Sequence, residues 1–264
     1  MLISTPAGLN HFYDFYTEAR AHSQWATFQY MTSDGGYVSA DELNILKTQM
    51  TTKQYSQEFE ARFETLASRV YYAFHQQLNV VHVERLPYQP LLVGMDFNVD
   101  PMTAVIAQSV GDQCHVIDEI VLANSNTPEM MAEINRRYPG GHGAVHPDPT
   151  GNARKTSAPV GKTDFCIIKE AGWPIYDKAG PYSIIDRLNT VNARMCDAKG
   201  NRRILIAPKC RNLIKSLNTI TYKEGTKIPD KSSGLDHIAD ALGYLIMGRF
   251  PLLKNEVTVT QVRL

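Results

Sequence analysis

Four aspartates occupy positions from which carboxylates could gather around a cation. Asp96 ends the apolar run LLVGMD, which has the length and flanking turn residues of a strand buried on both faces. Asp148 lies in HPDPTG, a favourable β-turn sequence, and Asp236 and Asp240 share one face of a predicted helix. Turns and a solvated helix face would also explain these residues. If the carboxylates converge, their oxygens suit Mg²⁺ or Mn²⁺.

The elements that must position these aspartates are predicted to alternate along the chain. Capping boxes at Ser39 with Glu42 and at Thr51 with Gln54 indicate two early helices, whereas residues 1–30 show no clean period. The expected strands cover residues 91–96, 102–110, 114–122, 143–148, 173–177 and 203–207. The expected later helices cover residues 128–138, 162–171, 181–197, 209–217 and 234–248. Three antiparallel strands followed by parallel strands predict an α/β mixed sheet with helices on both faces.

Composition excludes several classes of protein. The 264 residues contain 27 basic and 27 acidic side chains, so net charge gives no sign of a nucleic-acid partner. The four cysteines form no C-x-x-C pair, which argues against a zinc site or a disulfide framework. We expect a cytosolic protein, because no apolar run approaches the roughly 20 residues of a membrane span. VGKT lacks the first glycine of a phosphate-binding loop and the strand before it.

The order of these motifs resembles the ribonuclease-H-like nuclease domain of the large terminase subunit of tailed phages. In that family the first strand ends in G-x-D, matched at Asp96, and a D-P-x-G turn carries the second acid, matched from Asp148 to Gly151. A helix beginning D-H-x-x-D-A carries the third acid, matched from Asp236 to Ala241. The opening ISTPAGLNHFYDFY resembles the end of the family's ATPase domain. The resemblance covers most of the chain.

The resemblance implies a division of the chain. Residues 1–30 are the expected remnant of the end of an ATPase domain, and 31–87 are a helical linker. Residues 88–250 are the expected ribonuclease-H-like nuclease domain, and 251–264 are a C-terminal tail. Because the chain starts almost at the S-T-P element, we expect no ATPase activity in it. A shortened chain and a split gene would both explain this.

The implied activity is endonucleolytic cutting of double-stranded, concatemeric phage DNA during packaging, with two Mg²⁺ or Mn²⁺ ions. Asp96, expected on the central strand, would bridge both ions, while Asp148 and Asp240 would each hold one. Asp236 is a candidate fourth ligand or a supporting base. His146 and His237 flank the site and are expected to be exposed or supporting.

The implied macromolecular partners are DNA, the portal and the small terminase subunit, in the cytoplasm of the bacterial host and without a membrane. The candidate DNA-backbone contacts are basic residues in loops, namely Arg154, Lys155, Lys223, Lys227 and Lys231. Asp100 is expected to serve a turn, because of its Asp-Pro context, rather than to bind a metal transiently.

Two alternatives remain at this point. Another ribonuclease-H-like nuclease, such as a junction resolvase or a transposase core, would use similar acids. A non-catalytic docking module of the packaging motor would use the same aspartates only in turns and on a helix surface.

Overall fold

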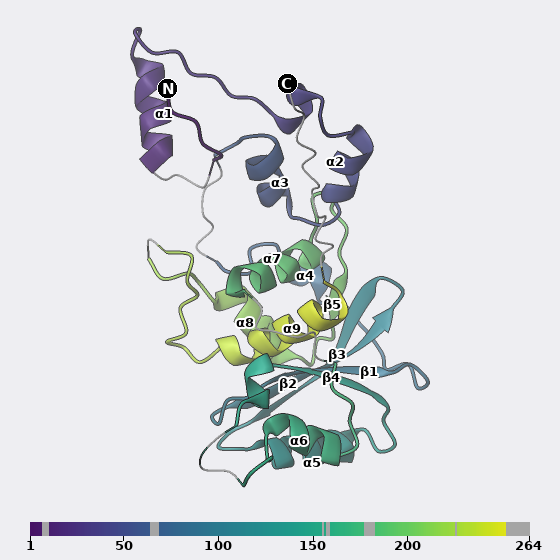
Figure 1. The fold of residues 1–264 in the computed structure, drawn as a ribbon. Helices are drawn as coiled ribbons and strands as arrows, with labels where there is room; N and C mark the ends of the chain where they lie inside the picture. Colours follow the sequence, from purple (N-terminus) through teal and green to yellow (C-terminus); the bar gives the residue numbers. More distant parts are fainter. Residues whose placement is uncertain are drawn as a thin grey trace, which may run out of the picture.

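A mixed five-stranded sheet lies between two layers of helices (Figure 1). The computed structural model describes residues 1–6, 11–63, 69–154, 156, 159–176, 183–224 and 226–251. The strands are β1 (Leu91–Asp96), β2 (Met102–Val110), β3 (Gln113–Leu122), β4 (Gly143–Pro147) and β5 (Ile204–Ile206). Their order is β4-β1-β2-β3-β5, with β1, β2 and β3 antiparallel, β4 parallel to β1, and β5 parallel to β3. The predicted α/β mixed sheet is confirmed, although β2 rather than β1 is its central strand.

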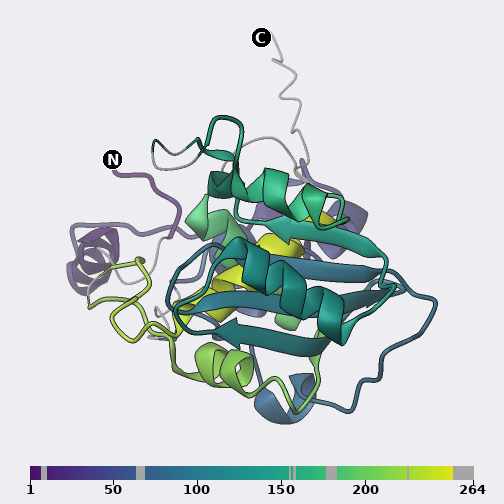
Figure 2. The same cartoon turned by 90° about the horizontal axis from the view of Figure 1, so that it is seen from below.

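Helices cover both faces of this sheet. The helices before the sheet are α1 (His11–Ala21), η1 (Thr32–Gly35), α2 (Ala40–Leu46), α3 (Thr52–Phe59) and α4 (Gln76–Asn79). Those after its third strand are α5 (Thr127–Arg137), η2 (Pro149–Asn152), α6 (Asp164–Glu170), α7 (Ile184–Met195), α8 (Arg211–Thr219) and α9 (Asp236–Arg249). Figure 2 shows α5 in front of the strands and α9 behind them. In the described part of the chain, no helix combines the length and apolarity needed to cross a membrane.

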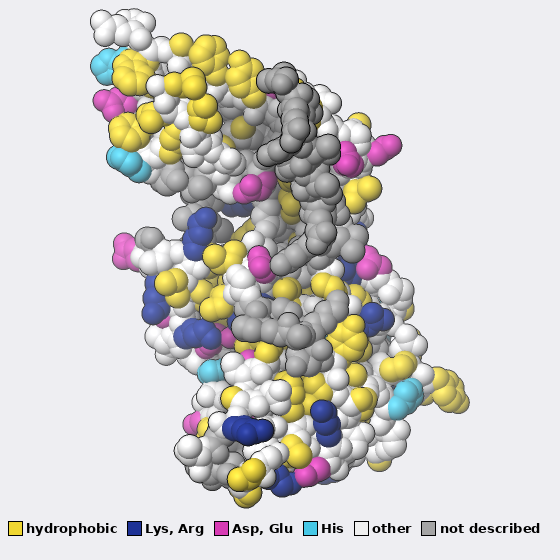
Figure 3. All heavy atoms as spheres, in the orientation of Figure 1, with side chains coloured by type: hydrophobic (Ala, Val, Ile, Leu, Met, Phe, Trp, Pro, Cys, Tyr) yellow, Lys and Arg dark blue, Asp and Glu magenta, His cyan; other side chains and the backbone are white. Residues whose placement is uncertain are grey.

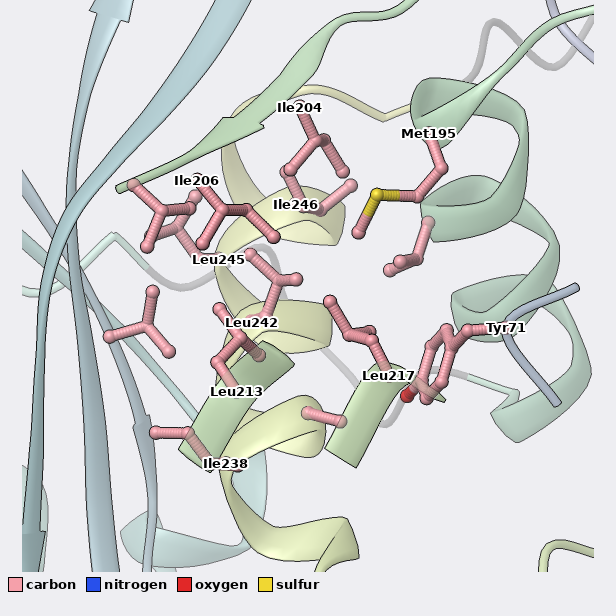
Figure 4. Packing of buried hydrophobic residues seen from close by; sticks show 14 of the residues in the cluster. Tyr71, Met195, Ile204, Ile206, Leu213, Leu217, Ile238, Leu242, Leu245 and Ile246 are labelled. Carbon is pink, nitrogen blue, oxygen red and sulfur yellow. The ribbon is translucent and has the colours of Figure 1, made fainter. Parts of the chain in front are cut away.

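Alternation along β1 divides the core between the two faces. Leu91, Val93 and Met95 pack in a cluster with residues of α5 and α6, whereas Leu92 packs in a second cluster with α7, α8 and α9. Figure 4 shows this second cluster, in which Leu242, Leu245 and Ile246 of α9 meet side chains of α8 and β5. Leu92, Gly94 and Asp96 therefore lie on the face of β1 that α9 covers.

Both edges of the sheet pair with short pieces of the same chain. On the outer edge of β4, Val145 donates its backbone N–H to Pro174 O at 2.9 Å and accepts a hydrogen bond from Tyr176 N at 2.8 Å. On the outer edge of β5, Ile206 O accepts a hydrogen bond from Val81 N at 3.1 Å. The strand expected at 173–177 is thus wrong in extent, because its described part makes one isolated bridge, between Ile175 and Val145.

Helices α1, α2 and α3 lie beyond α7, away from the sheet (Figure 1). Both capping boxes are confirmed, with Ser39 and Thr51 accepting from the third backbone N–H of α2 and α3. Helix α1 lies in the segment 1–30, which shows no clean period in the sequence. None of its residues is buried, so an apolar period could not have revealed it.

Candidate active site

The carboxyl end of β1 lies directly beneath α9, because glycine permits the contact. A Cβ on Gly94 would overlap the carbonyl oxygen of Ala241 and come within 2.8 Å of Leu245 Cβ. Asp96 follows two residues later on the same face, so it also faces α9. Helix α9, which carries Asp236 and Asp240, is thereby placed against the strand that carries Asp96.

Parallel pairing brings Asp148 to the same end of the sheet. Met95 pairs with Pro147, and Asp148 N donates to Met95 O at 3.0 Å, so Asp148 follows β4 beside Asp96. The Asp148 carboxylate caps η2 by accepting from Thr150 N at 2.9 Å. Asp148 is half-buried, and its turn role and its place beside Asp96 are compatible.

Asp236 and Asp240 are buried rather than solvated, with 3% and 7% of their surface exposed. Arg187 Nη2 of α7 lies 2.8 Å from Asp240 Oδ1. Lys231 Nζ, on the loop before α9, lies 2.8 Å from Asp236 Oδ2 and 2.9 Å from Asp240 Oδ2. The two cations neutralise the helix carboxylates, which removes the repulsion that burial of two like charges would cause.

His237 joins α9 to the end of β1. Its Nδ1 lies 2.9 Å from Asp96 Oδ2, and its Nε2 lies 2.9 Å from the side-chain amide of Asn98. With Asn98 Nδ2 as donor to Nε2, the ring proton is on Nδ1 and is donated to Asp96. His237 thus orients the Asp96 carboxylate, as expected for a supporting residue.

Burial and the neighbouring charges change the pKa of Asp96. Burial, with smaller effects of the Asp240 and Asp148 charges, raises the pKa of Asp96 to about 6, although the hydrogen bond from His237 acts in the opposite direction. The charges of both other acids therefore act on the Asp96 carboxylate and disfavour its ionised form. A cation placed between them would offset the cost of keeping Asp96 ionised.

Arg187 belongs to the site although sequence reasoning missed it. Its guanidinium is buried and lies 4.5 Å from the centroid of the Tyr244 ring. A Cβ on Gly243 would come within 2.8 Å of the Arg187 side chain, so this glycine makes room for it. The available signal was a basic residue on the apolar stripe of α7, four residues before Val191.

Of the two roles expected for His146, exposed or supporting, its burial excludes the exposed one. It is 2% exposed, and neither ring nitrogen has a hydrogen-bond partner among the described residues. Burial, with a smaller effect of the nearby Arg249 charge, lowers the pKa of His146 to about 4. The ring packs under α9, where a Cβ on Gly248 would lie 2.6 Å from His146 Nδ1. Asp100 is exposed, and its carboxylate accepts from Asn124 N at 3.3 Å.

The five basic residues predicted to contact DNA differ in their exposure and in their partners. Arg154, Lys223 and Lys227 are exposed, Lys155 lies outside the described residues, and Lys231 is committed to the two helix aspartates. Figure 3 shows some Lys and Arg side chains on the side of the molecule where α8 and the loop before α9 lie, and others elsewhere on the same face. Positive charge therefore lies on the surface next to the carboxylates.

The donor chemistry of the site fits a hard divalent cation. Its donors are carboxylate oxygens, and Asp236 Oδ1 is buried without a hydrogen-bond partner among the described residues. Across the same residues, no three His, Cys, Asp or Glu side chains are already arranged to hold a metal ion. Arg187 and Lys231 supply positive charge to Asp240 at this place. A metal ion at Asp240 would thus compete with these two cations.

Comparison with solved structures supports the fold. The large terminase of a thermophilic bacteriophage aligns at a TM-score of 0.69 and 15% identity, covering 94% of this chain and 61% of that protein. The nuclease domain of the P22 large terminase aligns at 0.53 and 12% identity, covering 67% of this chain and 89% of that domain. The SPP1 large terminase nuclease domain, solved with bound Mn, aligns at 0.46, which is too low to bear on this chain.

Comparison of sequences gives the family. This chain spans about three fifths (61%) of the large terminase from the thermophilic phage. No curated protein matches the sequence. The family model of the terminase RNaseH-like domain matches residues 93–249, a range that contains β4, α9, most of β1 and all four aspartates. The chain therefore belongs to the terminase RNaseH-like domain family.

Proposed function

We propose that this chain is a divalent-metal-dependent endonuclease that cuts double-stranded, concatemeric phage DNA during genome packaging. The observation that carries the proposal is that Asp148 follows β4 beside the end of β1, where Asp96 lies, under the helix that carries Asp240. Membership of the terminase family supports it.

The acids have distinct proposed roles. Asp96 would bridge two Mg²⁺ or Mn²⁺ ions, Asp148 and Asp240 would each hold one, and Asp236 would be a fourth ligand or a supporting base. When bound, such ions neutralise charge on the phosphate, activate a water molecule and stabilise the leaving oxygen. In the protein itself, His237 orients Asp96.

Two neighbouring cations, Arg187 and Lys231, neutralise the charge on Asp240. Arg187, which is buried, fixes the orientation of the Asp240 carboxylate. The Lys231 side chain is about half exposed, at 51%, and can withdraw to solvent when another cation binds the aspartates.

Contacts to the DNA backbone would suffice to position a duplex. We assign these contacts to Arg154, Lys155, Lys223, Lys227 and Lys231, because sequence-independent binding comes from lysine and arginine on phosphates. The portal and the small terminase subunit are proposed partners in the host cytoplasm. The nuclease unit is proposed to span 88–250, next to the linker 31–87, the segment 1–30 and the tail 251–264.

Nicking of a supercoiled plasmid tests the proposal. The wild type should nick with Mn²⁺ and stop when EDTA is added. Asp96→Asn should abolish nicking while duplex binding in a gel-shift assay persists, because the substitution removes the charge that bridges two cations. Asp41→Asn, an exposed aspartate in the first turn of α2, is the matched control and should nick normally. Nicking by Asp96→Asn at the wild-type rate would contradict the proposal and favour a docking module.

A further inference from the structure

The turn that carries Asp148 packs against the residue that follows Asp96. Gly151 ends the D-P-T-G turn, and a Cβ built on it would overlap the Phe97 ring and lie within 2.8 Å of three ring atoms. Gly151 does not have a positive φ, so the backbone conformation of the turn does not require glycine. Glycine is needed here because the aromatic ring occupies the space of a side chain.

The Phe97 ring is held on another side by α6. Its centroid lies 6.4 Å from that of Phe165, at an interplanar angle of 48°. Phe165 is a buried residue of α6, and Phe97 is partly buried against the core cluster on that face of the sheet. The ring therefore lies among η2, α6 and the end of β1, with little freedom to move.

Asp148 is tied to the same turn by two hydrogen bonds. Its carboxylate accepts from Thr150 N at 2.9 Å, and its carbonyl oxygen accepts from Gly151 N at 3.1 Å. The opposite attachment is to β1, through Asp148 N and Met95 O. A shift of Gly151 away from the ring would be transmitted to the Asp148 carboxylate, because Gly151 follows it closely in the same hydrogen-bonded turn.

We propose that Phe97 is a positioning residue, whose ring, seated on Gly151, sets the separation of the Asp96 and Asp148 carboxylates. The inference rests on the proposed function, in which these two acids share a metal site. Phe97 acts through the aspartates and takes no part in the reaction. Displacements of about 1 Å at a reacting centre can cost about 100-fold in rate, so a fixed separation matters.

A complementary pair of substitutions tests this role. Gly151→Ala adds a methyl group where the ring lies, so Mn²⁺ binding measured by calorimetry should weaken and plasmid nicking should slow, each by about 10 to 100-fold. Phe97→Leu removes the ring. The double variant Gly151→Ala with Phe97→Leu should recover much of both losses, because the smaller side chain leaves room for the methyl group. A role in general stability alone would not produce this recovery in metal affinity.

Gly35→Ala is the matched control, because a Cβ there meets the Tyr37 ring at an ordinary 3.4 Å, in η1 and away from the site. It should bind Mn²⁺ and nick as the wild type does. Circular dichroism and thermal melting of each variant establish that it folds; if Gly151→Ala does not, Phe97→Leu alone should still shift the Mn²⁺ affinity.

The possible outcomes separate the two proposals. Unchanged Mn²⁺ affinity in Gly151→Ala, or in Phe97→Leu where the alanine variant does not fold, would overturn the positioning role. So would a double variant that shows only the sum of the single losses. Wild-type protein that binds Mn²⁺ but fails to nick would instead overturn the proposed nuclease function, while the calorimetry would still decide the role of Phe97.

Discussion

Replacing Asp96 by asparagine should stabilise the metal-free protein at neutral and alkaline pH. The carboxylate is buried beside two other acids, which raises its pKa from 3.8 to about 6. Above pH 6 the folded protein holds an ionised group that the unfolded chain would solvate freely. A difference of about two pKa units corresponds to about 3 kcal/mol, the upper limit of the gain on removing the charge.

The expected dependence of the free energy of unfolding on pH is the reverse of that of most carboxylates. Below pH 3.8 Asp96 is protonated in both states and costs nothing, and between pH 3.8 and about 6 the cost grows as pH rises. Asparagine keeps the size of the side chain and can still accept the hydrogen bond from His237. Asp96→Asn should therefore unfold at higher urea concentration than the wild type at pH 8, and at about the same concentration at pH 4.

Urea denaturation in EDTA at the two pH values is the assay, with Asp41→Asn as the control. Equal stabilities of Asp96→Asn and the wild type at pH 8 would refute the reasoning, because the Asp96 charge would then carry no cost. A gain of the same size at pH 4 would refute it as well. Such a gain would have to come from packing rather than charge.

Three other perturbations have defined outcomes. Arg187→Gln should lower the free energy of unfolding by about 3 kcal/mol, because it leaves the buried Asp240 charge with only Lys231, and adding Asp240→Asn should restore part of this in urea denaturation. His146, with its pKa lowered to about 4, must stay neutral when folded, so its own contribution to stability should fall by about 3 kcal/mol on acidification from pH 6.5 to 4. The free energy of unfolding of His146→Leu, measured relative to the wild type, should therefore rise by about that amount over this range, and a difference that does not change with pH would rule out this source. Replacing Lys223 and Lys227 by alanine should weaken duplex binding without changing sequence preference and lower its salt slope by about 2, whereas an unchanged slope would place both outside the interface.

The aspartates were predictable because their signals are local. A strand that ends in Asp96, a turn that begins at Asp148 and two acids on one helix face can each be recognised within a few residues. Chain order and the parallel pairing rule then place the strand ends together. Local signals also identified the two capping boxes and the antiparallel strands β1 to β3.

The neighbours of those aspartates were not predictable in the same way. Arg187 meets Asp240 across 53 residues of sequence, and that contact depends on how α7 packs over α9. The contact between Phe97 and Gly151 likewise depends on the seating of η2, since a D-P-T-G sequence explains its glycine equally well as a turn residue. Burial of Asp236 could not be read from helical spacing, because spacing gives the face of a helix and not what covers it.

The pairing at the two borders of the sheet bears on self-association. A bare outer strand is a template onto which a strand of another copy can add, and native proteins avoid this by shortening or covering it. Here Val145 already uses both of its backbone groups on Pro174 and Tyr176, and Ile206 of the three-residue β5 accepts from Val81. A foreign strand would have to displace these pairs before it could bond. Growth of this sheet into an intermolecular aggregate is thus opposed at both ends, even when the protein is concentrated.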